Sequence, residues 1–344
     1  MKGVDESLAR RLDPAARTPL AVALSGGGDS IALLHLTLAW ARGRGRPVLA
    51  LTVDHGLNPD SAAWTAAAGA KARALGADWR ALAWTGPKPT SGIQARARAA
   101  RHALLAAAAR AAGASILLMG HTADDIAEGE AMRAADAPGL GRLREWSPSP
   151  AWPEGRGVFL LRPLLHARRA ALRAHLEAEG VDWLDDPANA DRRFARVRAR
   201  QTLAQGEGPA PSFPVLDLDP AISALAARVR FGEGGAEAAR AGLTDATPSA
   251  AKAVLAAALL CVAGGVRPPR GPALERLRGA IAAGDVATLA GCRIDARGEM
   301  VRIARATPRR GQAVTETPPD SWAGVRFKAA CGLLPDEPSL AVLD

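Results

Sequence analysis

Apolar runs alternate with alanine-rich helical segments along the first half of the chain. Five of these runs have the character of β-strands, at 20–24, 48–53, 79–84, 115–119 and 158–161. Strands that alternate with helices in this way predict right-handed βαβ units, in which helices cover both faces of a parallel sheet. The pattern therefore indicates an α/β fold with a doubly wound parallel sheet of about five strands. In such sheets, ligands bind beyond the carboxyl ends of the strands.

The second half of the chain is predicted to form a separate, smaller and mainly helical domain. The segment 206–220 contains four prolines and interrupts the helical periodicity, which is typical of a linker between domains. We therefore expect a catalytic domain at 1–205 and a C-terminal domain at 221–306. Within the latter the pattern predicts three helices and a small hairpin, at 221–241, 249–263, 271–283, 288–295 and 300–303. The proline-rich tail at 307–344 has no assigned structure.

The charge balance favours a nucleic-acid partner. The net charge is +9 and the isoelectric point is about 10.5, which favours binding to polyanions. A GC-rich genome also enriches arginine and alanine, so the placement of the arginines decides more than their number.

The remaining composition predicts a cytoplasmic protein without a membrane segment. No apolar run approaches 18 residues, and no N-terminal stretch has the layout of a signal peptide. The three cysteines, Cys261, Cys292 and Cys331, are isolated and form no C-x-x-C pair. We expect them to be buried apolar residues rather than metal ligands.

A glycine-rich turn directly after the first strand has the form of a phosphate-binding loop. It reads Ser25-Gly-Gly-Gly-Asp-Ser30, so Gly26, Gly27 and Gly28 leave backbone N–H groups open to an anion where the next helix begins. Ser25 and Ser30 add hydroxyl donors, which a simple tight turn would not need. Asp29 would repel a polyphosphate unless a divalent cation lay between them, so it predicts a Mg²⁺ site.

This loop resembles the S-G-G-x-D-S signature of the N-type ATP pyrophosphatases, which have the adenine nucleotide alpha hydrolase-like fold. The resemblance implies that ATP is cleaved between its α and β phosphates, giving an adenylated intermediate. The superfamily includes amidotransferases, NAD synthetases and tRNA-modifying enzymes, and the loop alone does not choose among them.

Two further polar clusters follow the second and fourth strands. Asp54 and His55 end the second strand, where Asp54 either caps the following turn or lies, with His55, beside the adenine and ribose of ATP. The stretch from His121 to Glu128 places three carboxylates within five residues, and these repel one another unless solvent or cations separate them. They are either an acidic first turn that complements the helix dipole or a site for a metal or an ammonium group. These carboxylates belong to Asp124, Asp125 and Glu128.

Two groups of arginines are candidates for binding RNA phosphates. Arg98 and Arg101 share one face of the helix expected at 90–112, and a solvated helical face explains them equally well. The second group comprises Arg192, Arg193, Arg196, Arg198 and Arg200, and Phe194 lies between them in the sequence. Arginine suits phosphate because its planar fork donates two parallel hydrogen bonds, although a charged surface helix is the alternative.

Together these motifs resemble those of the tRNA(Ile)-lysidine synthetases. The family patterns V-D-H-G-L, A-R-x-x-R-Y, H-x-x-D-D-Q-x-E-T, W-x-x-D-P-S-N-x-D-x-x-F-x-R-x-R-x-R and T-L-x-G have counterparts over most of residues 19–305. The chain departs from them at His102, Ile126 and Gly129, where tyrosine, glutamine and threonine are usual. The family's glycine-rich loop is also poorly matched at 136–141.

The resemblance implies that the wobble cytidine of the CAU anticodon of tRNA-Ile is converted to lysidine. ATP and free L-lysine would be the reactants, and Mg²⁺ the cofactor. It implies that residues 25–30, Asp54, His55 and His121 bind ATP, with Asp29 also holding the metal. It further implies that Asp124, Asp125 and Glu128 act with Asp29 in catalysis, binding the lysine ammonium group and accepting its proton. The arginines of both groups would bind tRNA.

Two alternatives stay open at this point, and so does the assembly. Another tRNA-modifying ATP pyrophosphatase, such as a thiolase, would need reactive or cluster-binding cysteines. A non-catalytic tRNA-binding relative would permit the departures at Ile126 and Gly129. A homodimer is compatible with the sequence, which does not fix the oligomeric state.

Overall fold

The computed structural model describes residues 2–134, 143–151, 153–185, 199, 203, 220–232, 234–264, 268–269, 271–306 and 320–333. The chain divides into two compact units. One contains residues 1–147 and 158–216, and the other contains 148–157 and 217–344.

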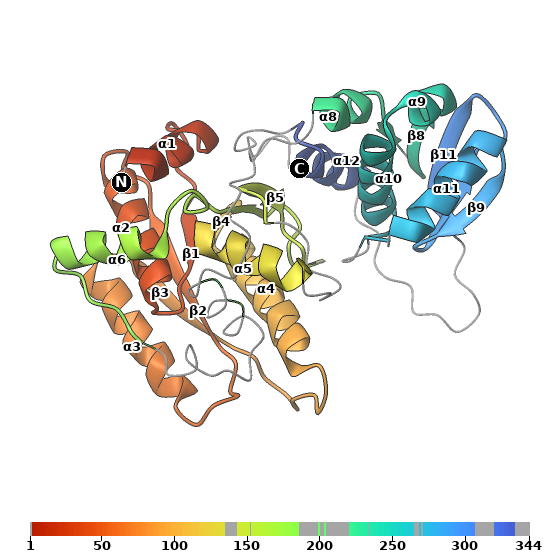
Figure 1. The fold of residues 1–344 in the computed structure, drawn as a ribbon. Helices are drawn as coiled ribbons and strands as arrows, with labels where there is room; N and C mark the ends of the chain where they lie inside the picture. The colour runs from red at the N-terminus through yellow and green to blue at the C-terminus, as the bar shows by residue number, and fades with distance from the viewer. Residues whose placement is uncertain are drawn as a thin grey trace. The chain divides into compact units, whose positions relative to one another are not determined.

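The first unit is built on a six-stranded sheet with the strand order β3-β2-β1-β4-β6-β5 (Figure 1). Its strands are β1 (Leu20–Ala23), β2 (Val48–Asp54), β3 (Asp78–Ala83), β4 (Ile116–Leu118), β5 (Trp146–Pro148) and β6 (Phe159–Leu161). The pairs β1–β2, β1–β4, β2–β3 and β4–β6 are parallel. The five strands expected from the apolar runs are all present, and β5 adds a sixth at the edge.

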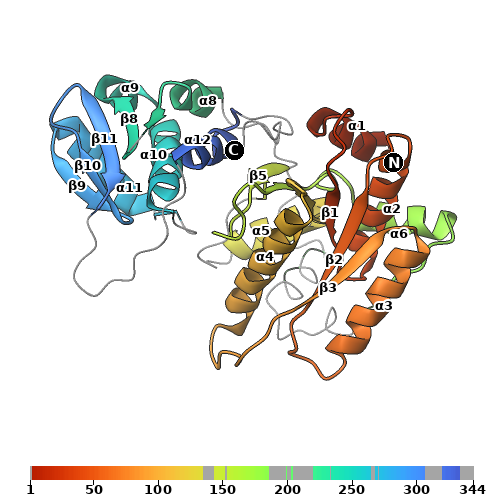
Figure 2. The same cartoon turned by 180° about the vertical axis from the view of Figure 1, so that it is seen from behind.

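Helices cover both faces of this sheet, as Figures 1 and 2 show. They are α1 (Lys2–Arg11), α2 (Gly28–Arg42), α3 (Ser61–Ala74), α4 (Ile93–Ala111), α5 (Ala123–Ala134) and α6 (Arg169–Ala178). Helices α2, α3 and α6 lie on one face, and α4 and α5 lie on the other. The predicted doubly wound α/β fold is confirmed. Because the chain winds outward from β1 to β3 and then returns to β4, the loops after β1 and β4 meet at the switch point.

A buried carboxylate fastens α1 to the segment before β5. Glu145 accepts hydrogen bonds from the Ser7 hydroxyl and from the guanidinium groups of Arg10, at 2.7 Å, and Arg11, at 3.0 Å. Burial raises the pKa of Glu145, but these hydrogen bonds and the Arg11 charge outweigh burial and hold the pKa below its ordinary value.

Glu145→Gln is therefore expected to destabilise the protein in a pH-dependent way. A carboxyl group whose pKa is lower in the folded state stabilises the fold above its ordinary value of 4.5, and this contribution is lost as the pH falls further. At pH 7 we expect a loss of about 1.5 to 3 kcal/mol, the range for hydrogen bonds to a charged group. Urea unfolding of both proteins between pH 7 and pH 3 measures this. A difference that stays constant over that range would contradict the assignment.

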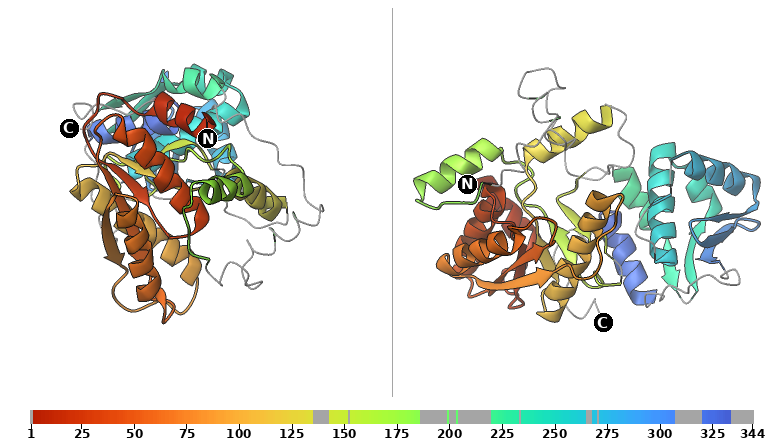
Figure 3. Two further views of the ribbon diagram at one scale, coloured as in Figure 1. Left: turned by 90° about the vertical axis from the view of Figure 1, so that its left-hand side faces the viewer. Right: turned by 90° about the horizontal axis from the view of Figure 1, so that it is seen from below.

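The second unit combines helices with a five-stranded antiparallel sheet of order β7-β8-β11-β10-β9. The strands are β7 (Arg230–Gly232), β8 (Gly235–Ala239), β9 (Val286–Leu289), β10 (Cys292–Asp295) and β11 (Met300–Arg305). The helices are α8 (Pro220–Ala226), α9 (Arg240–Asp245), α10 (Pro248–Ala263), α11 (Gly271–Ala283) and α12 (Asp320–Ala330). Helices α10 and α11 pack against the sheet (Figure 3). The unit is mainly helical, as expected. The predicted hairpin is present as β10 and β11, but the single strand expected over 288–295 is divided by a turn at Ala290 and Gly291, so that 288–289 belong to β9.

The helix expected at 221–241 is wrong. Its first part forms α8 and its last two residues begin α9, while β7 and β8 between them form a hairpin. Gly234 and Gly235 adopt positive φ angles of 97° and 144°, which an α-helix does not allow. In β8, Ala236 and Ala238 are buried while their neighbours are not, so alanine here follows the alternation of a strand.

The three cysteines are buried, as expected, and none of them forms a disulfide bond. Burial raises the pKa of the Cys261 thiol to about 12 and that of Cys292 to about 11. They belong to the hydrophobic core of the second unit, which also includes Phe327 of α12. The sequence had assigned no structure to the tail in which α12 lies.

Candidate active site

The loop between β1 and α2 is held in shape by one serine hydroxyl. Ser30 Oγ accepts hydrogen bonds from the backbone N–H groups of Ser25, at 3.2 Å, and Gly26, at 3.1 Å, and donates to the Gly27 carbonyl at 2.9 Å. Helix α2 starts at Gly28, so the N–H groups of Gly28 and Asp29 lie in its first turn, where the helix itself offers no acceptors. The expected phosphate-binding loop thus presents backbone donors at a helix N-terminus.

Backbone conformation at Gly26 and close packing at Gly120 favour glycine at these two positions, in the loop and beside it. Gly26 has a φ of +90°, and its carbonyl accepts a hydrogen bond of 2.9 Å from the Leu184 N–H. At the end of β4, a Cβ atom on Gly120 would lie 3.1 Å from the backbone oxygen of Asp29. The strand end that carries His121 is therefore packed directly against the phosphate-binding loop, and His121 is buried there.

The four carboxylates proposed from the sequence converge on one residue, Arg169, at the start of α6: three contact its side chain and Asp124 contacts its backbone. Its Nε lies 2.9 Å from Asp29 Oδ2, and one terminal nitrogen lies 3.1 Å from Glu128 Oε1. The other terminal nitrogen lies 3.7 Å from Asp125 Oδ1. The backbone N–H of Arg169 donates to Asp124 Oδ2 at 2.8 Å. One residue thus joins the acid of the phosphate-binding loop to the acids of α5.

The carboxylates differ in what else they contact. Asp125 Oδ2 accepts hydrogen bonds from the backbone N–H and hydroxyl of Thr122, at 2.8 and 3.0 Å. This is a capping arrangement at the start of α5, so Asp125 also has the structural role that the sequence left open. Glu128 is the most enclosed, with a side chain 1% exposed.

The cluster has more negative than positive charge in the described residues. Arg168 is the second arginine near it, with a terminal nitrogen 3.7 Å from Asp124 Oδ1. The charge of Arg173 also lowers the pKa of Asp29, so four carboxylates face three guanidinium groups. Burial lowers the pKa of Arg169, but its hydrogen bond to Asp29 and the nearby acidic charges outweigh burial and raise the pKa overall. Arg169 stays a cation, and the remaining excess of negative charge would be balanced by a further cation.

Sequence reasoning missed Arg169, although a signal was present. Two arginines occupy the last position before α6 and its first position, and the first turn of α6 contains no acid. Cations at a helix N-terminus oppose the helix dipole, so they require compensation from elsewhere in the fold. The carboxylates in the first turns of α2 and α5 provide it.

Arg169→Gln is expected to lower the free energy of unfolding by roughly 2 to 3 kcal/mol, somewhat less than for a fully buried pair. The Arg169 side chain is 17% exposed, and its removal leaves Asp29 and Glu128 without their shared cation. The matched control is Arg168→Gln, because the Arg168 side chain is 44% exposed and its nitrogen lies farther from its carboxylate, at 3.7 Å from Asp124 Oδ1. The control should lose less than about 1 kcal/mol. Equal losses for the two variants, measured by urea unfolding, would contradict the central role of Arg169.

The strand end after β2 supports the turn-capping alternative for Asp54. Asp54 Oδ1 accepts a hydrogen bond of 2.8 Å from the Gly56 N–H. His55 lies edge-on to the Trp84 ring, with 6.0 Å between the ring centroids. Burial lowers the pKa of His55, and the charges of Arg101 and Lys88 lower it further. Arg101 of α4 is thus near the carboxyl edge of the sheet.

Comparison with known proteins identifies the family. A family model described as a PP-loop domain matches residues 2–207. A tRNA(Ile)-lysidine synthase of Caulobacter vibrioides is 53% identical over 301 residues, which are 85% of this chain and 68% of that protein. The chain belongs to the tRNA(Ile)-lysidine synthase family. Another member, from Hyphomonas neptunium, is 43% identical over 298 residues, covering 81% of this chain and 79% of that one.

Among solved structures, a U34-tRNA thiolase from Methanococcus maripaludis has a TM-score of 0.49 and 17% identity, covering 60% of this chain and 74% of that one. This likeness is too low to bear on function. Membership of the lysidine synthases decides between the alternatives that the sequence left open, in favour of an ATP-dependent ligase.

Several residues that the family resemblance pointed to lie outside the described residues. These are the loop at 136–141 and the arginines Arg192, Arg193, Arg196, Arg198 and Arg200. Their assignment to tRNA binding stays a prediction. On α4, Arg98 is exposed, whereas His102, which replaces the tyrosine usual in lysidine synthases, is buried. Burial and the neighbouring arginines lower the pKa of His102 to about 3, so this histidine is neutral.

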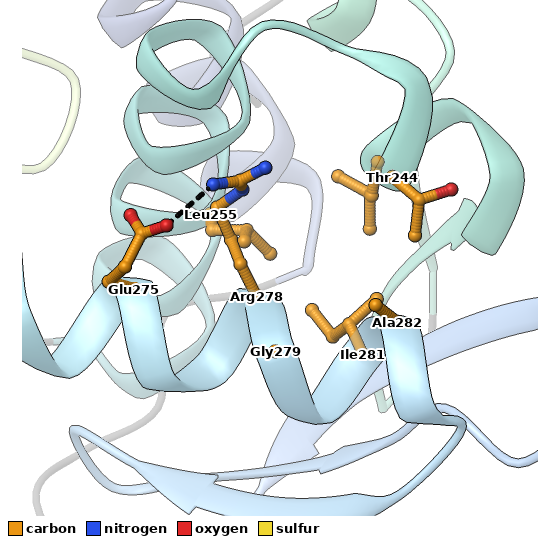
Figure 4. A pocket seen from close by; sticks show the side chains of 8 residues that line it. Thr244, Leu255, Glu275, Arg278, Gly279, Ile281 and Ala282 are labelled. Atoms are coloured by element: carbon orange, nitrogen blue, oxygen red, sulfur yellow. Dashed lines mark hydrogen bonds and ion pairs between the residues drawn. The ribbon is translucent and has the colours of Figure 1, made fainter.

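A pocket of about 240 Å³ in the second unit does not resemble a lysidine synthase active site (Figure 4). It lies between α9, α10 and α11, and most of its lining is apolar. Its arginine, Arg278, is bound to Glu275 at 2.8 Å. It contains neither a glycine-rich loop nor a group of acids.

The residues around Asp29 fit a divalent cation that is shared with a phosphate. Asp29 Oδ1 is buried and accepts no hydrogen bond from the described residues. Burial raises the pKa of Asp29, an effect that Arg169 offsets only in part, so a further cation would stabilise the carboxylate. Within the described ranges, no three His, Cys, Asp or Glu side chains are arranged to hold a metal ion on their own. Mg²⁺ commonly takes one or two carboxylates and completes its shell with phosphates and water.

None of the helices in the described part of the chain is long and apolar enough to cross a membrane.

Proposed function

We propose that this chain converts the wobble cytidine of the CAU anticodon of tRNA(Ile) to lysidine at the carboxyl edge of the first unit's sheet. The observation that supports this most directly is the contact of Arg169 with both Asp29 and Glu128. It joins a phosphate-binding loop to an acidic group that can attract an amine. A lysidine synthase needs both functions within reach of one cytosine.

In the first step, the 2-oxo oxygen of cytosine attacks the α-phosphorus of ATP, and pyrophosphate leaves. The N–H groups of Gly28 and Asp29, at the start of α2, are placed to bind the phosphate oxygens. Asp29 would hold Mg²⁺, which when bound neutralises charge on the phosphates. His121 and His55, at the ends of β4 and β2, would border the ATP.

In the second step, the ε-amine of lysine attacks carbon 2 of the adenylated cytosine, and AMP leaves. With a pKa near 10.4, about one lysine in 2,500 is neutral at pH 7, which costs roughly 4.6 kcal/mol. Asp124, Asp125 and Glu128 would bind the ammonium form, and one of them would accept the proton during attack. Glu128 is our choice for the carboxylate that faces the amine, because it is the most buried and already binds a cationic side chain.

The tRNA would be held by Arg98 and Arg101 and by the arginines between 192 and 200, with the second unit binding more of its backbone. Recognition of an exposed loop base is the usual way in which proteins read RNA sequence. We further propose that the enzyme works in the cytoplasm, where tRNA is modified, and we retain the homodimer as a prediction that sedimentation of the whole chain would test.

The experiment that tests this function is mass analysis of tRNA(Ile) after incubation with the protein, ATP, Mg²⁺ and lysine. We expect a gain equal to lysine minus water at the wobble cytidine, and an adenylated tRNA when lysine is omitted. A tRNA with uridine at the wobble position is the matched control and should stay unmodified. No gain in mass on the cytidine substrate would overturn the proposal.

A further inference from the structure

Trp84 forms a half-exposed aromatic surface beside the proposed active site. It directly follows β3, and its backbone N–H donates to the Asp54 carbonyl at 2.8 Å. This hydrogen bond fixes the tryptophan backbone at the end of β2. The Lys88 ammonium lies 4.2 Å from the centre of the indole ring and donates to the Trp84 carbonyl. The edge-on contact with His55 holds the ring from another side. The ring is therefore fixed in place and still partly accessible.

A hollow of about 560 Å³ lies between this tryptophan and α4. Arg96, Ala99 and Ala100 share one face of α4, and the alanine side chains end at Cβ, so they leave space beside the ring. Pro87 and Pro89 line the hollow from the connecting segment, which runs from β3 to α4 in Figure 2. The hollow is shallow and wide open to solvent, which suits one base of a large ligand rather than an enclosed small molecule.

The charges of the hollow select for an anion. Its lining contains two cations, Lys88 and Arg96, and no acid. The charge of Arg101 acts on the adjoining His55. An aromatic face bordered by cations is the combination that binds single-stranded nucleic acid, because the base stacks on the ring while the cations contact its phosphate.

The hollow also lies at a suitable distance from the phosphate-binding loop. Trp84 follows the edge strand β3, two strands away from β1, which leads into the loop. Two strand spacings place the ends of β1 and β3 about 10 Å apart on the carboxyl edge. A nucleotide adjacent to one that reacts at the loop would fall within this range.

We propose that the Trp84 hollow binds a nucleotide of the anticodon loop next to the reacting cytidine. The base stacks on the indole ring of Trp84, and its phosphate contacts Lys88 and Arg96. This inference rests on the proposed function, because it requires the cytidine to lie at the phosphate-binding loop. The adenine of ATP has the same chemistry, and the experiment distinguishes the two sources.

The test compares Trp84→Ala with Trp84→Phe, which keeps an aromatic face. The dissociation constants for unmodified tRNA(Ile) without ATP, and for ATP without tRNA, are measured for each variant by equilibrium binding. Loss of one stacked base is worth about 1 to 3 kcal/mol, so Trp84→Ala should weaken tRNA binding by roughly 5- to 150-fold. Trp84→Phe should retain most of the affinity, and ATP binding should change by less than about twofold.

A second variant keeps the test decisive if Trp84→Ala fails to fold. Arg96 is exposed, so Arg96→Ala should leave the urea midpoint unchanged. It should lower the slope of log affinity against log salt for tRNA by about 0.7, the value for one phosphate contact on a single strand. An unchanged slope, or a loss of ATP affinity with tRNA binding intact, would overturn the inference. Because these are binding measurements, they remain interpretable even if no lysidine is formed.

Discussion

Asp29→Ala is expected to lower tRNA-dependent pyrophosphate release by a factor on the order of 10³, near the upper end of the effect of removing one electrostatic stabiliser. The alanine removes the carboxylate that we assign to Mg²⁺ and also the partner of Arg169 Nε at 2.9 Å. Without it, charge that develops on the α-phosphate and on the departing pyrophosphate is no longer neutralised. Release of labelled pyrophosphate from ATP, with tRNA(Ile) present and lysine omitted, measures this step alone.

The matched control for this variant is Asp60→Ala. Asp60 is an exposed acid between β2 and α3 in the same unit. We expect its replacement to leave pyrophosphate release unchanged within about twofold, because its side chain is exposed and is assigned no contact with ATP or Mg²⁺. If Asp29→Ala behaves like this control, Asp29 is not part of the phosphate and metal site.

Glu128→Gln is expected to separate the second step from the first. Glutamine has nearly the same shape and retains an oxygen that can accept the 3.1 Å hydrogen bond from Arg169, but it has neither the negative charge nor the capacity to take a proton. Lysidine formation should therefore fall by a factor on the order of 10² or more, the scale of a lost acid–base group. Adenylated tRNA should accumulate when ATP and lysine are both present, and mass analysis of the tRNA detects it.

Glu130→Gln serves as the control on the same helix, since Glu130 is half-exposed and is assigned no role in the reaction. It should form lysidine at close to the normal rate. If Glu128→Gln instead stops adenylation as completely as Asp29→Ala, then Glu128 belongs to the metal site. The lysine-binding role would then pass to Asp124 or Asp125.

The fold of the first unit could be predicted from the sequence because each buried strand appears as a short run of apolar residues. Leu20, Ala21 and Val22 of β1 are fully buried, and a strand covered on both faces appears as a continuous apolar run. The phosphate-binding loop was also readable, since its glycines, serines and acid are adjacent in the chain. The alanine-rich second unit was harder to predict, because alanine fits a buried strand such as β8 as well as a helix.

The contacts that assemble the candidate site were beyond local reasoning. Arg169 follows Asp29 by 140 positions and Glu128 by 41, so no spacing rule connects them. What joins them is the strand order, which brings the end of β1, the end of β4 and the start of α6 together. The sequence pointed to the acids as a group that needs cations, but it did not identify Arg169, the cation that the fold places among them.

The hydrogen bonds of the Ser30 hydroxyl have a consequence for the affinity of the enzyme for ATP. Ordering the backbone of one residue costs about 1 to 2 kcal/mol of conformational entropy. If residues 25–30 became ordered only on contact with ATP, this cost would weaken ATP binding by several kcal/mol. Ser30 Oγ already ties the N–H groups of Ser25 and Gly26 to the loop, so this entropy is lost during folding instead. A larger share of the interaction with the triphosphate then remains available as binding free energy.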